Sequence, residues 1–137
     1  MTMFRIFDTA ATGMSAQTLR LNLVASNMAN ADAVSSSIEE TYRARQPVFQ
    51  TILDETSADP TPQGVRMAGV VESQAPLIEE YAPDHPLANE AGYIFRPNVN
   101  TVEEMANMIS ASRSYQSNVE VANAAKQLLL ATLRMGQ

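Results

Sequence analysis

The side chains that could do chemistry are few and lie far apart in the sequence. The single histidine, His85, lies between Asp84 and Pro86, a pattern typical of a turn. The 137 residues contain no cysteine, which excludes thiol nucleophiles, disulfides and cysteine-bound zinc. A structural role is therefore favoured for His85, and neither a metal centre nor a cofactor is expected.

The acidic residues do not form the paired carboxylates that general acid–base catalysis requires. They occur instead as neighbours in the sequence, at Glu39/Glu40, Asp54/Glu55, Glu79/Glu80 and Glu103/Glu104. Adjacent side chains on a strand or helix point in different directions, so these pairs do not converge on a substrate. A phosphate-binding glycine loop and a convincing Ser-His-Asp order are also missing. The sequence predicts that the protein is not an enzyme and binds no small-molecule substrate.

Two asparagines, Asn27 and Asn30, stand out with Asp32 in residues 26–32, SNMANAD. Short polar side chains compete with the backbone for hydrogen bonds and therefore suit helix ends and turns. A C-terminal helix cap is an adequate role for them. A second interpretation is that they also fix the angle at which the chain enters the segment that follows.

A long amphipathic helix is expected before these asparagines. The first thirty residues contain no proline, and apolar or small residues recur three and four positions apart, which is typical of a helix face. The two series are Phe4, Ala11, Thr18, Ala25 and Phe7, Met14, Leu21, Met28. They predict a helix over residues 3–30, about 40 Å long.

The last forty residues show the same pattern. Thr101 and Glu104 match a capping box, in which the hydroxyl and the carboxylate each accept a hydrogen bond from the first turn of a helix. The heptad series are Met108, Tyr115, Ala122, Leu129 and Ser112, Val119, Lys126, Leu133. They predict a second helix over residues 102–135, about 50 Å long.

The middle of the chain has a different character, because all seven prolines lie between residues 47 and 97. Short strands are predicted over residues 42–53, 64–72, 77–81 and 93–96, with a polar hairpin tip at 54–63 and a polar loop at 35–41. The predicted fold is α+β, with long N- and C-terminal helices paired as an antiparallel coiled coil. A small β-rich module is inserted between the helices and is expected at one end of the pair.

The predicted organisation is an N-terminal helix in residues 1–32, a β-rich outer module in 33–98 and a C-terminal helix in 99–137. Charge follows this division: residues 31–98 carry eleven acidic residues against four arginines, whereas the two ends are nearly neutral. The net charge of −6 argues against nucleic acid as a partner. Apolar runs are too short for a membrane span, and the start of the chain lacks the apolar core of a Sec signal peptide. A protein working outside the cytoplasm would need another export route.

The helices carry more apolar surface than one pairing can cover, because a two-helix contact hides only a narrow stripe. Contiguous exposed apolar surface usually marks an interface, so we expect the helices to pack against copies or relatives of this chain. The candidate assembly residues are Phe4, Phe7, Ala11, Met14, Leu21, Met28, Met108, Tyr115, Val119, Ala122, Leu129 and Leu133. A soluble homo-oligomeric helical adaptor is the alternative.

Several segments resemble bacterial flagellar basal-body rod proteins. The motif SNMANAD after an amphipathic helix resembles the signature shared by rod and hook proteins. Residues 97–105 (PNVNTVEEM) and 110–121 (SASRSYQSNVEV) are more specific and resemble proximal-rod members. Proximal-rod proteins also have similar segments at the positions of residues 42–46 (YRARQ), 81–86 (YAPDHP) and Gly92-Tyr93. The resemblance therefore covers essentially the whole chain.

This resemblance implies a structural subunit of the proximal rod, a hollow drive shaft that transmits torque and encloses an export channel. The terminal helices would form the inner tube. Implied partners are copies of the chain, the rod proteins FlgB, FlgF and FlgG, the adaptor FliE, the MS-ring protein FliF and the flagellar type III export apparatus. The implied location is the rod in the periplasmic space, reached without a cleavable signal peptide.

Overall fold

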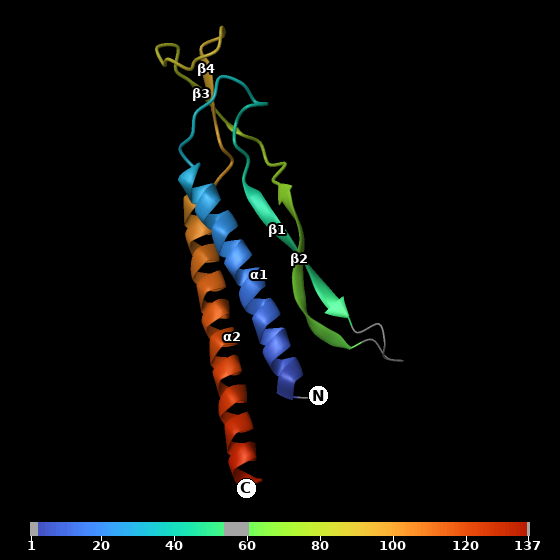
Figure 1. Ribbon diagram of the computed structural model, residues 1–137. Coiled ribbons are helices and arrows are strands. Elements are labelled where there is room, and N and C mark those ends of the chain that lie inside the picture. The colour runs from blue at the N-terminus through green and yellow to red at the C-terminus, as the bar shows by residue number, and fades with distance from the viewer. Residues whose placement is uncertain (1–2, 54–60, 137) are drawn as a thin grey trace.

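The computed structural model describes residues 3–53 and 61–136 and contains two long helices with two small sheets between them in sequence. The elements are α1 (Met3–Ala29), β1 (Arg45–Leu53), β2 (Pro62–Glu72), β3 (Ile78–Tyr81), β4 (Tyr93–Arg96) and α2 (Thr101–Met135). The helices lie side by side and run in opposite directions (Figure 1). The predicted α+β fold with paired antiparallel helices is therefore confirmed. Residues 54–60 of the predicted hairpin tip lie outside the described residues.

Three contacts fix how the two helices are aligned. The backbone of Gly13 lies against the side chain of Asn118, Arg20 donates a hydrogen bond to Asn107 at 3.1 Å, and Asn27 bonds Glu104 at 3.1 Å. Since α2 has 35 residues and α1 has 27, this alignment leaves the last turns of α2 without an opposing helix (Figure 1). We call residues 129–135 the C-terminal overhang; at 1.5 Å per residue it is about 10 Å long.

The seam between the helices consists of small and polar residues. Buried alanines and a valine line it, at Ala10, Val24, Ala111 and Ala125. Between them lie Gly13 and Asn118, whose contact is so close that a Cβ atom on Gly13 would lie 2.7 Å from Nδ2 of Asn118. Small residues allow the two backbones to approach, so this pairing buries little apolar surface of its own.

The hairpin formed by β1 and β2 lies beside α1, as Figure 1 shows. The prediction of a module at one end of the helices is wrong for this hairpin and holds for β3 and β4 alone. Thr9 donates a hydrogen bond to the carbonyl of Gln63 at 2.7 Å, and the Val65 amide donates to Thr12 at 3.2 Å. Gly64 makes this approach possible, because a Cβ atom there would collide with Thr12. The short threonine side chains thus bring the hairpin against the helix.

The second sheet closes the end where α1 finishes and α2 begins. Strands β3 and β4 pair in antiparallel orientation, and Ser35 extends the sheet by exchanging two backbone hydrogen bonds with Phe95. Gly92, before β4, has a positive φ of 82°, which glycine adopts without strain. Ile94, Phe95 and Pro97 are buried at this end.

The cap of α2 differs from the predicted one. Asn100, and not Thr101, is the N-cap residue, and its side chain accepts from the amides of Val102 and Glu103 at 3.1 and 3.3 Å. Thr101 is the first residue of the helix, and the Glu104 carboxylate turns inward to Asn27. Asparagine is among the best N-cap residues, so Asn100 takes the position one residue earlier.

Candidate assembly surface and polar junction

Asn27 is the centre of the buried polar group at the closed end of the helix pair. Only 1% of its surface is exposed. Its oxygen accepts from the Tyr42 hydroxyl at 2.8 Å and from the Arg45 amide at 2.9 Å, while its nitrogen donates to the Arg45 carbonyl at 2.9 Å and to Glu104 at 3.1 Å. One side chain therefore ties α1 to β1, to the preceding loop and to α2. This arrangement supports the interpretation that Asn27 fixes the path of the chain beyond the helix.

Asn98 completes this group, which we call the polar junction (Asn27, Tyr42, Arg45, Asn98 and Glu104). Its oxygen accepts from the Ala44 amide at 2.8 Å, and its nitrogen donates to the carbonyl of Ala75 at 2.9 Å. The segment that leads into α2 is thereby held against the start of β1 and the loop after β2.

The other two residues of the signature have more local roles. The Asn30 side chain donates to the Ser26 carbonyl at 2.8 Å, which caps the last turn of α1. Asp32 accepts a hydrogen bond from Arg96 at 3.0 Å, but its side chain is 92% exposed. An ion pair this exposed contributes little stability. The signature thus combines one buried hub, one cap and one surface contact.

The predicted apolar stripe of α1 does not lie in the seam. Each stripe residue comes one position after a seam residue; for example, Met14 follows Gly13. Successive side chains on a helix point about 100° apart around its axis, so the stripe points to the side of the pair and not toward α2. Met14, Leu21 and Met28 are accordingly half-buried at the flank of the pair, whereas Phe4 and Ala11 are exposed. The seam escapes a hydrophobicity pattern because alanine, glycine and amide side chains form it.

The stripe of α2 is rotated out of the seam in the same sense. Its seam residues Glu104, Ala111, Asn118 and Ala125 lie one or four positions before the stripe residues, except Leu133, which continues the series seven positions after Lys126. On both helices the stripe is offset from the seam in the direction in which the residue numbers increase. Because the two helices run in opposite directions, these offsets place both stripes on the same side of the pair. The hairpin, bound through Thr9 and Thr12, lies on the opposite side of α1.

The two stripes together form one surface, which we call the apolar face. In the register of the seam contacts, Met14 of α1 lies level with Tyr115 of α2, and Leu21 lies level with Met108. Met108, Val119, Ala122 and Leu129 are half-buried, whereas Tyr115 and Leu133 are exposed. The members are Phe7, Met14, Leu21, Met28, Met108, Tyr115, Val119, Ala122, Leu129 and Leu133. Within residues 3–53 and 61–136, no element covers this side of the helix pair.

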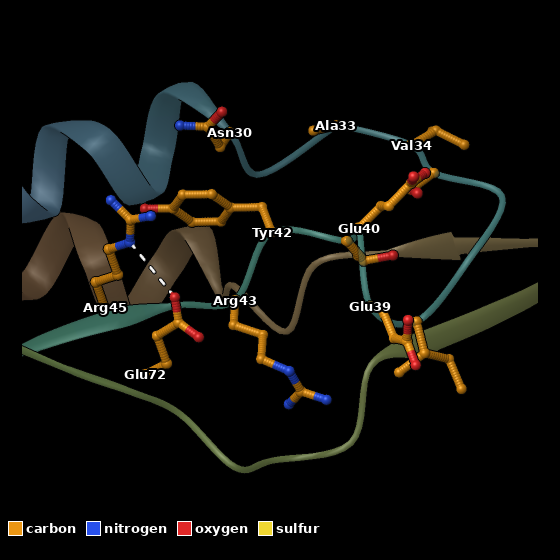
Figure 2. Close-up of a pocket in the computed structure, with 12 residues that line it drawn as sticks. Asn30, Ala33, Val34, Glu39, Glu40, Tyr42, Arg43, Arg45 and Glu72 are labelled. Atoms are coloured by element: carbon orange, nitrogen blue, oxygen red, sulfur yellow. Dashed lines mark ion pairs between the residues drawn. The ribbon is translucent and has the colours of Figure 1, made fainter.

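A pocket of about 610 Å³ lies at the closed end, between the end of α1 and the loop that follows it. We call it the end pocket. Figure 2 shows Tyr42 and Arg45 on one side of it and the acidic side chains of Glu39 and Glu40 on the other. Arg45 pairs with Glu72 at 3.9 Å and lies over the Tyr42 ring. The lining is strongly charged and open to solvent, unlike the mainly apolar lining of most small-molecule sites.

Within the described residues, no group of three acidic or histidine side chains could hold a metal ion. Across the same residues, neither helix combines the length and the hydropathy that a bilayer span requires.

Comparison with known families identifies the class of protein. Residues 7–35 match the family described as "Flagella basal body rod protein", and residues 90–135 match "Flagellar basal body rod FlgEFG protein C-terminal". These segments contain nearly all of α1 and α2. Both helices therefore have the sequence character of structural proteins of the flagellar rod.

Individual relatives narrow this class. The chain is 49% identical to the flagellar basal-body rod protein FlgC of Salmonella typhimurium and 48% identical to that of Yersinia enterocolitica, with all of each chain covered. It is 32% identical to FlgC of Borreliella burgdorferi, over 100% of this chain and 99% of the relative. The chain belongs to the FlgC family of flagellar basal-body rod proteins.

Family membership confirms three predictions from the sequence. The protein is a structural subunit of the flagellar basal-body rod, it is not an enzyme, and it assembles with other rod proteins in the flagellar basal body. Membership of this family also favours a rod subunit over the alternative function of a soluble adaptor. The long-range hydrogen bonds of Asn27 and Asn98 were not predictable, because nothing in the sequence pairs these amides with residues up to 77 positions away.

Proposed function

We propose that the apolar face is the assembly surface through which this subunit joins the rod. The observation that carries the proposal is that both stripes turn to one side of the helix pair and remain uncovered there. Residues 1–32 and 99–137 would form the inner tube around the export channel, and residues 33–98 would form the outer module. The concentration of acidic residues in the outer module is consistent with a water-facing surface.

The proposed mechanical role is to transmit torque along this tube. Close-packed interiors have low compressibility and pass strain directly to their neighbours. Helices covered on several sides by other subunits would therefore resist twisting. The polar junction would carry the load between the helices and the outer module, since Asn27 of α1 bonds both Glu104 of α2 and the backbone of Arg45 in the outer module.

The proposed partners are copies of the chain, the rod proteins FlgB, FlgF and FlgG, the adaptor FliE and the MS-ring protein FliF. The amphipathic character of residues 3–29 supports delivery through the flagellar type III export apparatus to a periplasmic rod without removal of a leader. The intact mass of the subunit in purified basal bodies tests this route. A mass lacking N-terminal residues would contradict it.

A pair of adjacent variants tests the assembly surface. Tyr115→Asp places a charge on the apolar face, whereas Gln116→Asp places one on a neighbouring exposed position of the same helix. A hot-spot side chain near the centre of an interface, for which tyrosine is favoured, contributes about 2 kcal/mol or more. Each subunit makes the contact, so Tyr115→Asp should abolish motility and incorporation into basal bodies. Gln116→Asp should retain both. Equal incorporation of the two variants, with unchanged helix content by circular dichroism, would contradict the proposal.

A further inference from the structure

The two ends of the molecule differ in shape and charge in a complementary way. The C-terminal overhang projects at one end of the helix pair (Figure 1). The end pocket is lined by residues beside the end of α1, which lies at the opposite end of the pair. Contacts between unlike ends of identical molecules repeat without closing, and they generate an open helical assembly. Complementary ends are therefore what such an assembly requires.

The overhang is apolar and basic. Leu130, Leu133 and Met135 are exposed, because no helix lies opposite them. The last acidic residue of the chain is Glu120; the overhang contains one cation, Arg134, and Lys126 lies three residues before its start. These two cations outweigh the partial negative charge that a helix carries at its C-terminus.

The end pocket combines a few apolar side chains with a charged lining in which acidic residues are in excess. Val34, Ile38 and Tyr42 supply the apolar part of its lining, and Ile38 is 49% exposed. Of the two arginines in the lining, Arg45 is paired with Glu72, and Arg43 donates to the carbonyls of Ser73 and Ala75 at 3.2 Å. No ion pair among the residues that the structure describes includes Glu39 or Glu40. The uncompensated charge of the pocket is therefore negative.

We infer that the C-terminal overhang of one copy docks in the end pocket of a second copy, with leucine side chains against Ile38 and the cations against Glu39 and Glu40. The volume of about 610 Å³ is within the range of sites that enclose ligands of several side chains' size. The inference rests on the proposed function and adds to it a second contact, which is directed along the helix axis and shares only Leu129 and Leu133 with the apolar face.

Cysteine cross-linking in basal bodies tests the contact, and the absence of native cysteine removes background. In the double variant Ile38→Cys/Leu133→Cys, oxidation should produce dimers and higher multiples, because the two positions lie at opposite ends of one chain. Each single variant should give dimers at most. The matched control Ile38→Cys/Asn123→Cys, with Asn123 exposed on α2 before the overhang, should not produce the series.

The outcomes separate this inference from the proposed function. A double variant that is incorporated but not cross-linked between copies overturns the inference and leaves the apolar face as the assembly surface. Cross-links from these cysteines to a different rod protein would also overturn it, because the occupant would not be a second copy. Failure of the unsubstituted chain to enter basal bodies would instead contradict the proposed function.

A charge exchange on the purified full-length chain provides a test that does not depend on incorporation. Glu39→Lys/Glu40→Lys should weaken self-association, measured by sedimentation, by about fivefold, as expected for the loss of two exposed ion pairs. Adding Lys126→Glu/Arg134→Glu to the same chain should restore it. Unchanged association in the first variant, or no recovery in the combined variant, would overturn the inference.

Discussion

The closed end of the molecule and the open end of its helix pair are built in opposite ways. At the closed end, Asn27 donates a hydrogen bond to Glu104, and Asn27 and Asn98 also satisfy backbone groups through short hydrogen bonds. Phe95 and Pro97 are buried at the same end. Toward the open end, the seam offers small alanine side chains, while large apolar residues such as Leu133 remain exposed.

This difference separates what one chain can stabilise from what it leaves to its neighbours. A buried polar network that is complete within the chain defines a single geometry. An exposed apolar surface gains stability only when another molecule covers it. The closed end therefore belongs to the folding of the subunit, and the open end belongs to its assembly.

The largest effect on stability is expected at the centre of the closed end. Asn27→Ala removes four hydrogen bonds and leaves buried Glu104 and the Arg45 backbone without these partners, so it should lower the free energy of unfolding by about 3 kcal/mol or more. Chemical denaturation measures the change. Asn22→Ala, at an exposed position of the same helix, is the control and should stay within about 0.5 kcal/mol. If Asn27→Ala and Asn22→Ala lowered the free energy of unfolding by similar amounts, the closed end would have no special role in the stability of the subunit.

A smaller loss is expected at the turn before β4. Gly92→Ala should cost about 2 kcal/mol, because the backbone has a positive φ and the new Cβ atom would lie 2.9 Å from Cε2 of Tyr81. Thermal unfolding of the full chain measures it. Gly69→Ala has open space around it and should be neutral or slightly stabilising. If Gly92→Ala left thermal stability unchanged, the closed end would be as insensitive to substitution as the open end, which would contradict the comparison.

The boundary between the two regions can be sharpened at the start of α2. Asn100→Ala should lower the free energy of unfolding by about 1 kcal/mol, because its side chain accepts from two amides of the first turn. Thr101→Ala should cost less than about 0.5 kcal/mol at an exposed helical position. Denaturant titration of both variants decides between them, and the opposite order would restore the capping box predicted from the sequence.

The smallest effect on the isolated chain is expected in the overhang. Leu133→Asp should change the free energy of unfolding by no more than about 0.5 kcal/mol, because the side chain is 61% exposed. The same variant should nevertheless lose incorporation into basal bodies, since Leu133 belongs to both proposed assembly contacts. A large loss of stability in the free chain would show that the open end is part of the subunit's own core.

The sequence was sufficient to predict features that depend on local patterns. Helical periodicity located α1 and α2 to within about one residue, and the alternation around Val65 and Val71 located β2. It did not locate the seam, because Ala10, Gly13 and Asn118 carry no hydrophobic signal. It also did not place the β1–β2 hairpin beside α1, since that contact depends on Thr9, Thr12 and the missing side chain of Gly64.

The candidate site divides in the same way. The residues of the apolar face could be chosen from heptad spacing, although their common direction required the register between the helices. The end pocket could not be anticipated, because it is formed by residues that are brought together only when the loop after α1 folds back toward β1 and β2.

The buried position of Asn27 also has a consequence for the chemical ageing of the protein. Asparagine side chains deamidate when the next backbone nitrogen attacks the side-chain carbonyl, and asparagine is among the thermolabile residues for this reason. In α1 that nitrogen is held in the helical ladder, and the Asn27 amide is fixed by four hydrogen bonds out of contact with water. Conversion to aspartate would create a second carboxylate 3.1 Å from Glu104. The same hydrogen bonds that make Asn27 the centre of the polar junction thus also protect it from deamidation. Deamidation would replace its hydrogen bond to Glu104 with repulsion between two carboxylates.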